Sequence, residues 1–221
     1  MMILGWRCPV CGASGRVPCR TCHAQLRVAG PLPQLAGIDW CTALLSYRGV
    51  GRELVARTKF RNQRAALGWL GRGMAELVRA DAPGAIDIVT YAPANPSHVR
   101  ERGFDHGAIL ARVVAKCLRL PVGHLLERGR GAPLTGQSAG ERHGGPPLRP
   151  HRTARKAAAW PLLGQSVLLV DDVVTTGATM ASAAVQLRAM GAAVVFAVAA
   201  AYTPAPGARA EIVMKLPSPP R

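Results

Sequence analysis

The sequence predicts an α/β fold in which helices flank a parallel β-sheet, with a small cysteine-rich segment at the amino-terminal end. Residues 167–170 are four consecutive aliphatic residues without polar alternation, which is typical of a strand buried on both faces of a parallel sheet. Leu, Val and Ala dominate the composition and aromatic residues make up only 5%, which suits helices packed on a sheet better than a β-sandwich. A length of 221 residues allows one domain of ordinary size plus a small appendage.

The appendage is predicted to be residues 1–33, a zinc-ribbon-like segment that carries two Cys-x-x-Cys pairs, Cys8 with Cys11 and Cys19 with Cys22. Four thiolates at this spacing can close a tetrahedral shell around one Zn²⁺ and leave no position open for catalysis, so we expect a structural site. A segment this short cannot bury enough apolar surface to fold alone, and metal binding would supply its folding free energy. Two disulfides or a redox Cys-x-x-Cys motif are the alternatives, which are less favourable for an intracellular chain with two such pairs so close together.

Residues 34–221 are predicted to form the main domain, after a linker at residues 30–33. The first part of this domain shows strand and helix patterns in turn. A hydrophobic run predicts a strand within residues 38–47, and apolar residues at helical spacing follow as far as Val78. A second strand is expected over residues 86–93, then a loop over residues 94–106 and a helix whose apolar face runs from Leu110 to Leu118.

The second part of the domain begins with a stretch that has no hydrophobic periodicity. It is rich in Arg, Gly, Pro, Thr and Ser, so we predict a mobile, lid-like loop over about residues 127–160. The buried strand at residues 167–170 follows, then a turn and a helix over about residues 180–190 that Gly191 would end. Residues 193–202 predict the last core strand, and the Pro-rich residues 204–221 predict a flexible tail.

The residues that carry chemistry are concentrated directly after the buried strand. Asp171 and Asp172 lie at its carboxyl end, where open α/β sheets bind ligands. The turn that follows brings small residues, hydroxyl groups and the N–H groups of a helix N-terminus together, which favours a phosphate; it consists of Val174, Thr175, Thr176, Gly177, Ala178 and Thr179. Ionised carboxylates only accept hydrogen bonds, so they suit the hydroxyls of a ribose. The alternative is that the threonines cap the helix and the aspartates bind a cation or lie solvated.

The string from Asp171 to Thr179 resembles the phosphoribosyl-pyrophosphate (PRPP) binding motif of type I phosphoribosyltransferases, two acidic residues followed by a Thr-Thr-Gly-x-Thr loop. With its cysteine pairs, the chain as a whole resembles the ComF family, competence-associated proteins that pair an N-terminal zinc-binding segment with a phosphoribosyltransferase domain. The resemblance implies a type I phosphoribosyltransferase-like fold, a turn that binds the 5-phosphate of PRPP, and a catalytic acidic pair, Asp171 and Asp172, that fixes the ribose. Mg²⁺ would bind with PRPP, mainly through substrate oxygens and water.

Further segments match patterns of that family. Residues 102–106, Arg-Gly-Phe-Asp-His, are similar to the Arg-Gly-Phe-Asn-Gln pattern of its pyrophosphate loop, so the resemblance assigns Asn95, Arg100 and Arg102 to pyrophosphate, which planar guanidinium groups suit. Residues 135–142 resemble its Thr-Gly-x-Ser-x-x-Glu-Arg element, which makes Arg142 a candidate for a lid-borne charge over pyrophosphate. Lys59-Phe60 corresponds to a Lys-aromatic pair near the substrate cleft. For Arg100 and Arg102 the alternative is that they belong to a general basic surface. For Lys59-Phe60 it is a solvated lysine beside a core aromatic, and for Arg142 it is a solvated, disordered arginine.

The chain carries 28 Lys and Arg against 12 Asp and Glu, a formal net charge of +16, so its surface attracts polyanions. A genomic bias toward arginine, with charges spread over solvated faces, is the alternative. No apolar run reaches the roughly 20 residues that a membrane helix needs. The first apolar residues are too few for a signal peptide, so we expect a cytoplasmic protein without membrane insertion.

Together these patterns favour an enzyme that binds PRPP or another phosphorylated ribose and transfers the ribosyl 5-phosphate group to an unidentified nitrogen nucleophile. The charge and the family resemblance support a second hypothesis, a single-stranded DNA binding accessory protein of DNA uptake or recombination whose PRPP-type site is not catalytic. No general base is assignable, since His98, His106 and Glu141 merely lie in suitable loops. The zinc-bearing segment is the candidate for the hood, the variable region over the cleft that selects the acceptor. The chain could also form a homodimer or a complex with the competence machinery, and the sequence does not decide between these.

Overall fold

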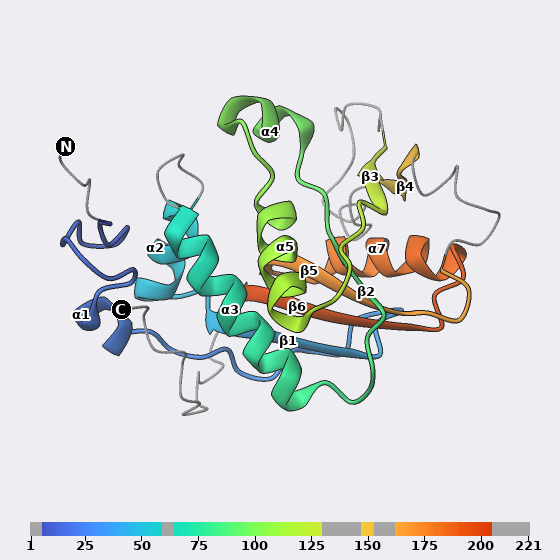
Figure 1. Cartoon of the computed structure of the whole chain (residues 1–221), viewed down its shortest axis with the longest axis horizontal. Helices are drawn as coiled ribbons and strands as arrows, with labels where there is room; N and C mark the ends of the chain where they lie inside the picture. Colours follow the sequence, from blue (N-terminus) through green and yellow to red (C-terminus); the bar gives the residue numbers. More distant parts are fainter. Residues whose placement is uncertain (1–5, 59–63, 130–146, 153–161, 205–221) are drawn as a thin grey trace.

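The core of the protein is a four-stranded parallel sheet (Figure 1). The computed structural model describes residues 6–58, 64–129, 147–152 and 162–204. The strands lie in the order β1 (Trp40–Ser46), β6 (Val194–Tyr202), β5 (Ser166–Val174) and β2 (Ile88–Tyr91). Each neighbouring pair is parallel, and Leu168 of β5 lies between Phe196 of β6 and Val89 of β2. The predicted parallel α/β sheet is therefore confirmed, and the carboxyl ends of the four strands lie at the same end of the sheet.

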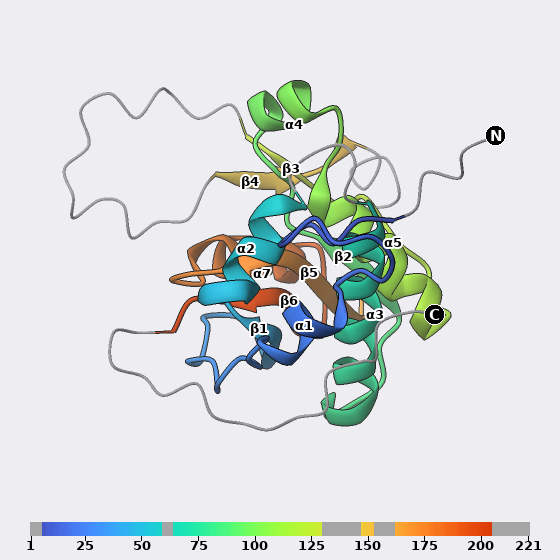
Figure 2. The same cartoon turned by 90° about the vertical axis from the view of Figure 1, so that its left-hand side faces the viewer.

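Helices cover both faces of this sheet (Figure 2). One face carries α2 (Gly49–Arg57), α3 (Arg64–Asp81) and α5 (His106–Leu118), and the other carries α7 (Ala178–Ala189). Side chains of β5 alternate between the two cores: Leu168 and Val170 pack with α3 and α5, whereas Val167 and Leu169 pack with α7. This double burial explains the unbroken aliphatic run. None of the helices in the described ranges is long and apolar enough to cross a membrane.

Both edges of the sheet are covered by neighbouring chain. At the β1 edge, Val28 forms an antiparallel bridge with Leu45. At the β2 edge, Val122 forms a parallel bridge with Val89. Each bridge occupies hydrogen-bonding groups of an edge strand, so both edge strands are covered over part of their length within the described residues.

The amino-terminal segment packs onto the main domain rather than standing apart from it. Its described residues include one short helix, α1 (Arg20–Ala24). Val17 and Leu26 are buried in the same apolar cluster as Trp69 of α3, and the His23 ring meets Trp69 edge-on with centroids 5.8 Å apart. The described part of residues 1–33 therefore shares a core with the residues that follow it.

Two stretches predicted as loops contain regular structure. Within residues 94–106 lies helix α4 (Pro96–Arg102), because Asn95 accepts a hydrogen bond from the Ser97 N–H as an N-cap and Pro96 suits the first turn. The predicted lid-like loop includes β3 (Leu126–Arg128) and β4 (Leu148–Pro150), which pair antiparallel. Leu126 and Leu148 are buried in the core that α7 shares, a tertiary contact that local periodicity cannot reveal. Residues 130–146 and 153–161 of the predicted loop and residues 205–221 of the predicted tail lie outside the described residues.

Candidate functional site

A cavity of about 310 Å³ opens at the carboxyl ends of β2 and β5. Its walls come from the segment after β2, α4, the start of α5, β3 and the end of β5. Asp171, Asp172 and Thr179 line it, and so do Asn95 and Arg102. The structure therefore brings the predicted carboxylates together with two of the residues predicted to bind pyrophosphate.

Asp171 and Asp172 lie in the carboxyl-terminal half of β5 and are partly exposed. The N–H of Asp172 donates to Oδ1 of Asp171 at 2.8 Å, and the N–H of Val173 donates to Oδ1 of Asp172 at 2.7 Å. Burial, followed by the negative charge of Asp172, raises the pKa of Asp171 well above its ordinary range. Two adjacent carboxylates of this kind can accept hydrogen bonds from a diol, or they can bind a hydrated cation.

The turn after β5 forms a second hollow of about 30 Å³. All six predicted turn residues line it, and it shares Asp171 and Thr179 with the larger cavity. Gly177 has a φ of +80°, the left-handed region that glycine adopts without strain, and it is the N-cap of α7. The turn therefore lies beside the carboxylates and ends at a helix N-terminus, as the sequence predicted.

The hydroxyl groups of this turn are mostly available. Thr176 Oγ1 accepts a long hydrogen bond of 3.4 Å from the Ala178 N–H, so this threonine helps to cap α7. Within the described ranges, the hydroxyls of Thr175 and Thr179 have no hydrogen-bond partner. Free hydroxyls and the unpaired first N–H groups of a helix are the donors that bind an anion at such a turn.

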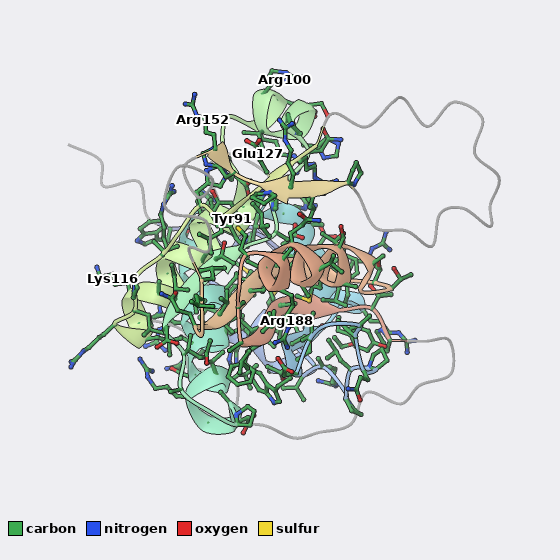
Figure 3. The ribbon with its side chains drawn as sticks, turned by 90° about the vertical axis from the view of Figure 1, so that its right-hand side faces the viewer. Tyr91, Arg100, Lys116, Glu127, Arg152 and Arg188 are labelled. Atoms are coloured by element: carbon green, nitrogen blue, oxygen red, sulfur yellow. The ribbon has the colours of Figure 1, made fainter. Side chains whose placement is uncertain are left out.

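Helix α4 carries the residues predicted for pyrophosphate. Oδ1 of Asn95 accepts hydrogen bonds from the N–H (3.0 Å) and the hydroxyl (2.8 Å) of Ser97, so Asn95 caps the helix while it lines the cavity. Arg102 lines the cavity as well, whereas Arg100 is exposed on the outer side of α4, away from the cavity wall (Figure 3). Two other predictions from the resemblance, Arg142 and Lys59-Phe60, lie outside the described residues.

Asp105 and His106 build the wall at the start of α5. The Asp105 carboxylate accepts hydrogen bonds from the N–H groups of Ala94 (3.0 Å) and Ala108 (3.2 Å), which fastens the segment after β2 to α5. His106 is buried, and its Nε2 lies 3.2 Å from the carbonyl oxygen of Thr58. An aspartate before a helix is a recognisable N-cap signal, but no local pattern indicates the contact between His106 and Thr58.

Arg128 of β3 is a cavity residue that the sequence analysis missed. Its Nε–H donates to the carbonyl oxygen of Pro93 at 2.9 Å, a bond between residues 35 positions apart. Arg128 stands at the edge of the stretch without periodicity, so neither a motif nor a repeating pattern distinguishes it from the many other arginines of the chain.

The four cysteines of the amino-terminal pairs meet at one point. Their sulfur atoms all lie within 4.8 Å of one another, and Cys11 and Cys19 Sγ are 3.6 Å apart, well beyond the roughly 2.05 Å of a disulfide. Burial acts to raise the pKa of Cys8. Backbone hydrogen bonds, of which the one from Cys19 is the strongest, outweigh burial and lower the pKa to about 7. Burial and then hydrogen bonds with the other thiols raise the pKa of Cys22. Such a cluster could hold a metal ion such as zinc.

The cysteine segment does not reach the cavity. None of the residues described between positions 6 and 33 lines it. The segment expected to act as a hood over the acceptor therefore contributes nothing to the described walls.

Several solved structures match part of this chain. They include glutamine PRPP amidotransferase from B. subtilis (22% identity, TM-score 0.43), purine phosphoribosyltransferase from Pyrococcus horikoshii Ot3 (17%, 0.39) and adenine phosphoribosyltransferase from Saccharomyces cerevisiae (15%, 0.41). These matches cover 63%, 62% and 64% of this chain, and 27%, 81% and 70% of the other chains. This chain thus spans about a quarter of the length of the amidotransferase.

Among curated proteins, no sequence matches this chain. The chain does match the phosphoribosyl transferase domain family, over residues 105–215. That range contains α5, β5, the turn and α7, and hence the acidic pair and the turn residues. Because the match extends over half of the 221 residues, the chain belongs to the phosphoribosyl transferase domain family.

Proposed function

We propose that this chain binds PRPP together with Mg²⁺ and transfers the ribosyl 5-phosphate group to a nitrogen nucleophile. The observation that carries the proposal is that Asp171 lines both the large cavity and the hydroxyl-lined turn. A phosphate held at the turn would therefore have its ribose beside the carboxylates. Membership of the family supports a PRPP-using transferase at the family level.

Each part of the cavity has a role in the proposed reaction. The N–H groups at the start of α7 and the hydroxyls of Thr175 and Thr179 would bind the 5-phosphate. Asp171 and Asp172 would accept hydrogen bonds from the two ribose hydroxyls. Arg102 would face the pyrophosphate, whose charge Mg²⁺, bound mainly through PRPP oxygens and water, would partly neutralise.

The transfer exchanges one bond at C1 of the ribose for another. The bond from C1 to the pyrophosphate oxygen breaks and its electron pair leaves on pyrophosphate, while the lone pair of the nitrogen forms the new bond to C1. The nitrogen then loses its proton to water. Positive charge develops on C1 between the two events, and the nearby carboxylates stabilise that charge. Holding the ribose at both ends would lower the activation free energy further, because the reacting atoms no longer have to meet by diffusion.

Isothermal titration with PRPP and Mg²⁺ tests this proposal. The double variant Asp171→Asn plus Asp172→Asn should bind at least about tenfold more weakly, since it loses hydrogen bonds to charged groups. A matched control is Glu76→Gln plus Asp81→Asn, which changes the net charge equally at two exposed positions of α3 outside the cavity. Equal affinity of the wild-type protein and the Asp171 and Asp172 variant would contradict the proposed site.

We also propose that the cysteine cluster binds zinc as a structural site in a ComF-like amino-terminal segment. The cluster of free thiols supports this, because four thiolates satisfy the tetrahedral preference of zinc. Reduced thiols are also what a cytoplasmic location would maintain.

A second candidate function, binding of single-stranded DNA, is supported by the formal net charge of +16. Contacts between arginines and the phosphate backbone would dominate, because only 5% of the residues are aromatic and could stack on bases. Affinity should fall steeply as salt rises. Undetectable binding of an oligonucleotide at low salt would remove this candidate, and a change in DNA affinity on adding PRPP would connect it to the transferase site.

A further inference from the structure

Three aromatic rings stack where β2 meets the pair of β3 and β4. His124 is the ring common to both contacts: its centroid lies 5.3 Å from that of Tyr91 and 3.9 Å from that of His151, and the planes are only 20° and 19° apart. Tyr91 ends β2, His124 precedes the first residue of β3 by two positions, and His151 directly follows β4. The stack therefore joins three segments that are well separated in the chain.

The stack lies behind the wall of the large cavity. Tyr91 is followed directly by residues 92–93, which line the cavity, and β3 adds a wall residue as well. Burial and then the charge of Asp105 raise the pKa of Tyr91, while Arg112 of α5 opposes them. Asp105 is itself a wall residue, and its charge also acts on the pKa of His124. A movement of the stacked rings would therefore shift residues that enclose the ligand site.

The two ends of β4 are attached in different ways. Leu148, its first residue, is buried in the core beside α7. At the other end, the N–H of His151 donates to the carbonyl oxygen of Leu125 at 2.8 Å, and the His151 ring joins the stack. A pair of strands this short is only marginally stable by itself, so contacts between side chains such as stacked rings are needed to hold it. The stack therefore helps to fasten the end of β4.

Charged groups act on both imidazoles of the stack. Oε2 of Glu127 lies 3.8 Å from Nε2 of His151, and Oε1 of the same carboxylate forms an ion pair of 2.8 Å with Arg149. Burial and then the charge of His151 lower the pKa of His124 below its ordinary 6.5. Asp105, Glu127 and a backbone hydrogen bond act to raise that pKa but are outweighed. His124 is therefore uncharged at neutral pH.

Protonation of both imidazoles makes the stacked arrangement unfavourable. His151 can accept a first proton because Glu127 lies beside it, although Arg149 already balances part of the Glu127 charge. A second proton on His124 then places two positive rings face to face, with centroids 3.9 Å apart. Even at the dielectric constant of water, two unit charges at about this distance repel each other by an amount that changes an equilibrium roughly fivefold. The doubly charged rings therefore favour separation.

We propose that the stack of Tyr91, His124 and His151 is a proton-sensitive latch, which holds the end of β4 against β3 while His124 is neutral and releases it when both imidazoles are protonated. Because folding disfavours the protonated form of His124, the stack contributes fully to stability above the ordinary pKa of 6.5, and this contribution is lost as pH falls below it. The effect of the latch on PRPP rests on the proposed function, whereas the latch itself depends only on the fold.

Hydrogen exchange of the His151 N–H, measured by NMR between about pH 5 and pH 8, tests the latch. The protection factor, which corrects for the intrinsic effect of pH on exchange, should fall at least about fivefold toward the acid end in the wild-type protein. His124→Phe keeps an aromatic ring for the stack but cannot take up a proton, so its protection factor should stay constant within about twofold.

His98→Phe is the matched control for the exchange measurement. It removes an exposed histidine of α4 outside the stack, so it should keep the wild-type pH dependence of the His151 protection factor. Circular dichroism verifies that each variant is folded. If His124→Phe is not folded, His151→Phe carries the comparison with the Leu126 and Glu127 N–H groups of β3 as the readout, because it also leaves a single imidazole in the stack.

Titration with PRPP and Mg²⁺ over the same pH range tests the connection to the cavity. The phosphate of PRPP also takes up a proton near about pH 6, so affinity falls with pH for every variant. Between about pH 7.5 and pH 5.5, the wild-type protein should lose up to about fivefold more affinity than His124→Phe does. The two proteins should bind equally at the upper end of the range.

Equal pH dependence of the protection factor in the wild-type protein and in His124→Phe would overturn the latch. If protection differs as expected but both proteins lose the same PRPP affinity, the connection between the latch and the cavity is overturned. A wild-type protein that does not bind PRPP at any pH would refute the proposed function, and the exchange measurement alone would then decide on the latch.

Discussion

Replacing Gly177 by alanine tests how the phosphate turn is held. Gly177 has a φ of +80°, and a Cβ added there would lie 2.3 Å from Cδ2 of Leu35. Leu35 is only 6% exposed and reaches the turn from the segment that precedes β1. A methyl group at position 177 therefore meets two obstacles, a backbone conformation that L-residues avoid and a space that is already occupied.

The two obstacles have separate magnitudes. The left-handed conformation costs a non-glycine residue about 1–2 kcal/mol. An extra methyl group in a packed region costs a further 1–3 kcal/mol or so. Gly177→Ala should thus lower the free energy of unfolding by about 2–5 kcal/mol. Gly164→Ala isolates the first cost, because Gly164 has a φ of +74° and nothing within 4 Å of an added Cβ.

Urea unfolding of a double-mutant cycle measures both terms. In a Leu35→Ala background the space is free, so Gly177→Ala should cost only the backbone term of about 1–2 kcal/mol. Gly164→Ala should cost the same in either background, since it touches neither residue. The reasoning is refuted if Gly177→Ala costs no more than Gly164→Ala, or if its cost does not depend on Leu35.

The acidic pair and the cysteine cluster give two further predictions. Asp171→Asn should raise thermal stability near neutral pH while it weakens PRPP binding, because the folded-state pKa of Asp171 lies above its ordinary 3.8, which means that folding disfavours the charged carboxylate. The gain should shrink as pH falls through the folded-state pKa toward 3.8, which melting curves between about pH 4 and pH 8 would measure; a variant less stable than wild type at the upper end would contradict it. If the cysteine cluster holds zinc as proposed, chelation should lower the melting temperature, because Val17 and Leu26 share a core with Trp69. Cys11→Ser should resemble the chelated protein, and an unchanged melting temperature after verified metal loss would count against a structural metal.

The elements that the sequence predicted are those whose signals are local. The aliphatic run of β5 reflects burial on two faces, and the two cores on either side of Leu168 and Leu169 confirm that reading. The turn from Val174 to Thr179 and the helix after it follow from glycine and hydroxyl residues at fixed spacing. Helix α4 was missed although its signal was present, since Asn95 before Pro96 is an N-cap followed by a favoured first-turn residue.

Other parts of the site depend on contacts that no local pattern contains. The bond from Arg128 to Pro93 and the contact of Leu35 with Gly177 join residues that are far apart in the chain. The strands β3 and β4 are three residues each, too short to show alternation, and their burial depends on the core beside α7. The acidic pair could be located from sequence, but its neighbours in the cavity required the fold.

The proposed zinc site at the cysteine cluster and the proposed PRPP site are expected to be separable. Val28 joins the amino-terminal segment to the β1 edge of the sheet, whereas the cavity opens beside β5 and β2, on the other side of β6. Leu35 links the amino-terminal half of the chain to the turn, yet it lies after the cysteine segment and packs on Gly177 itself. Metal-free protein kept folded at low temperature should therefore bind PRPP within about threefold of the metal-bound form.

Leu35→Ala should weaken PRPP binding without affecting the metal, the reverse of the result expected for metal removal. It removes the side chain that covers the turn, so PRPP affinity should fall while the zinc content, measured by atomic absorption, stays unchanged. A large loss of PRPP affinity on metal removal, in protein shown by circular dichroism to be folded, would mean that the two regions are coupled. In that case the shared core around Trp69, rather than Leu35, would be the connection between the metal and the ligand site.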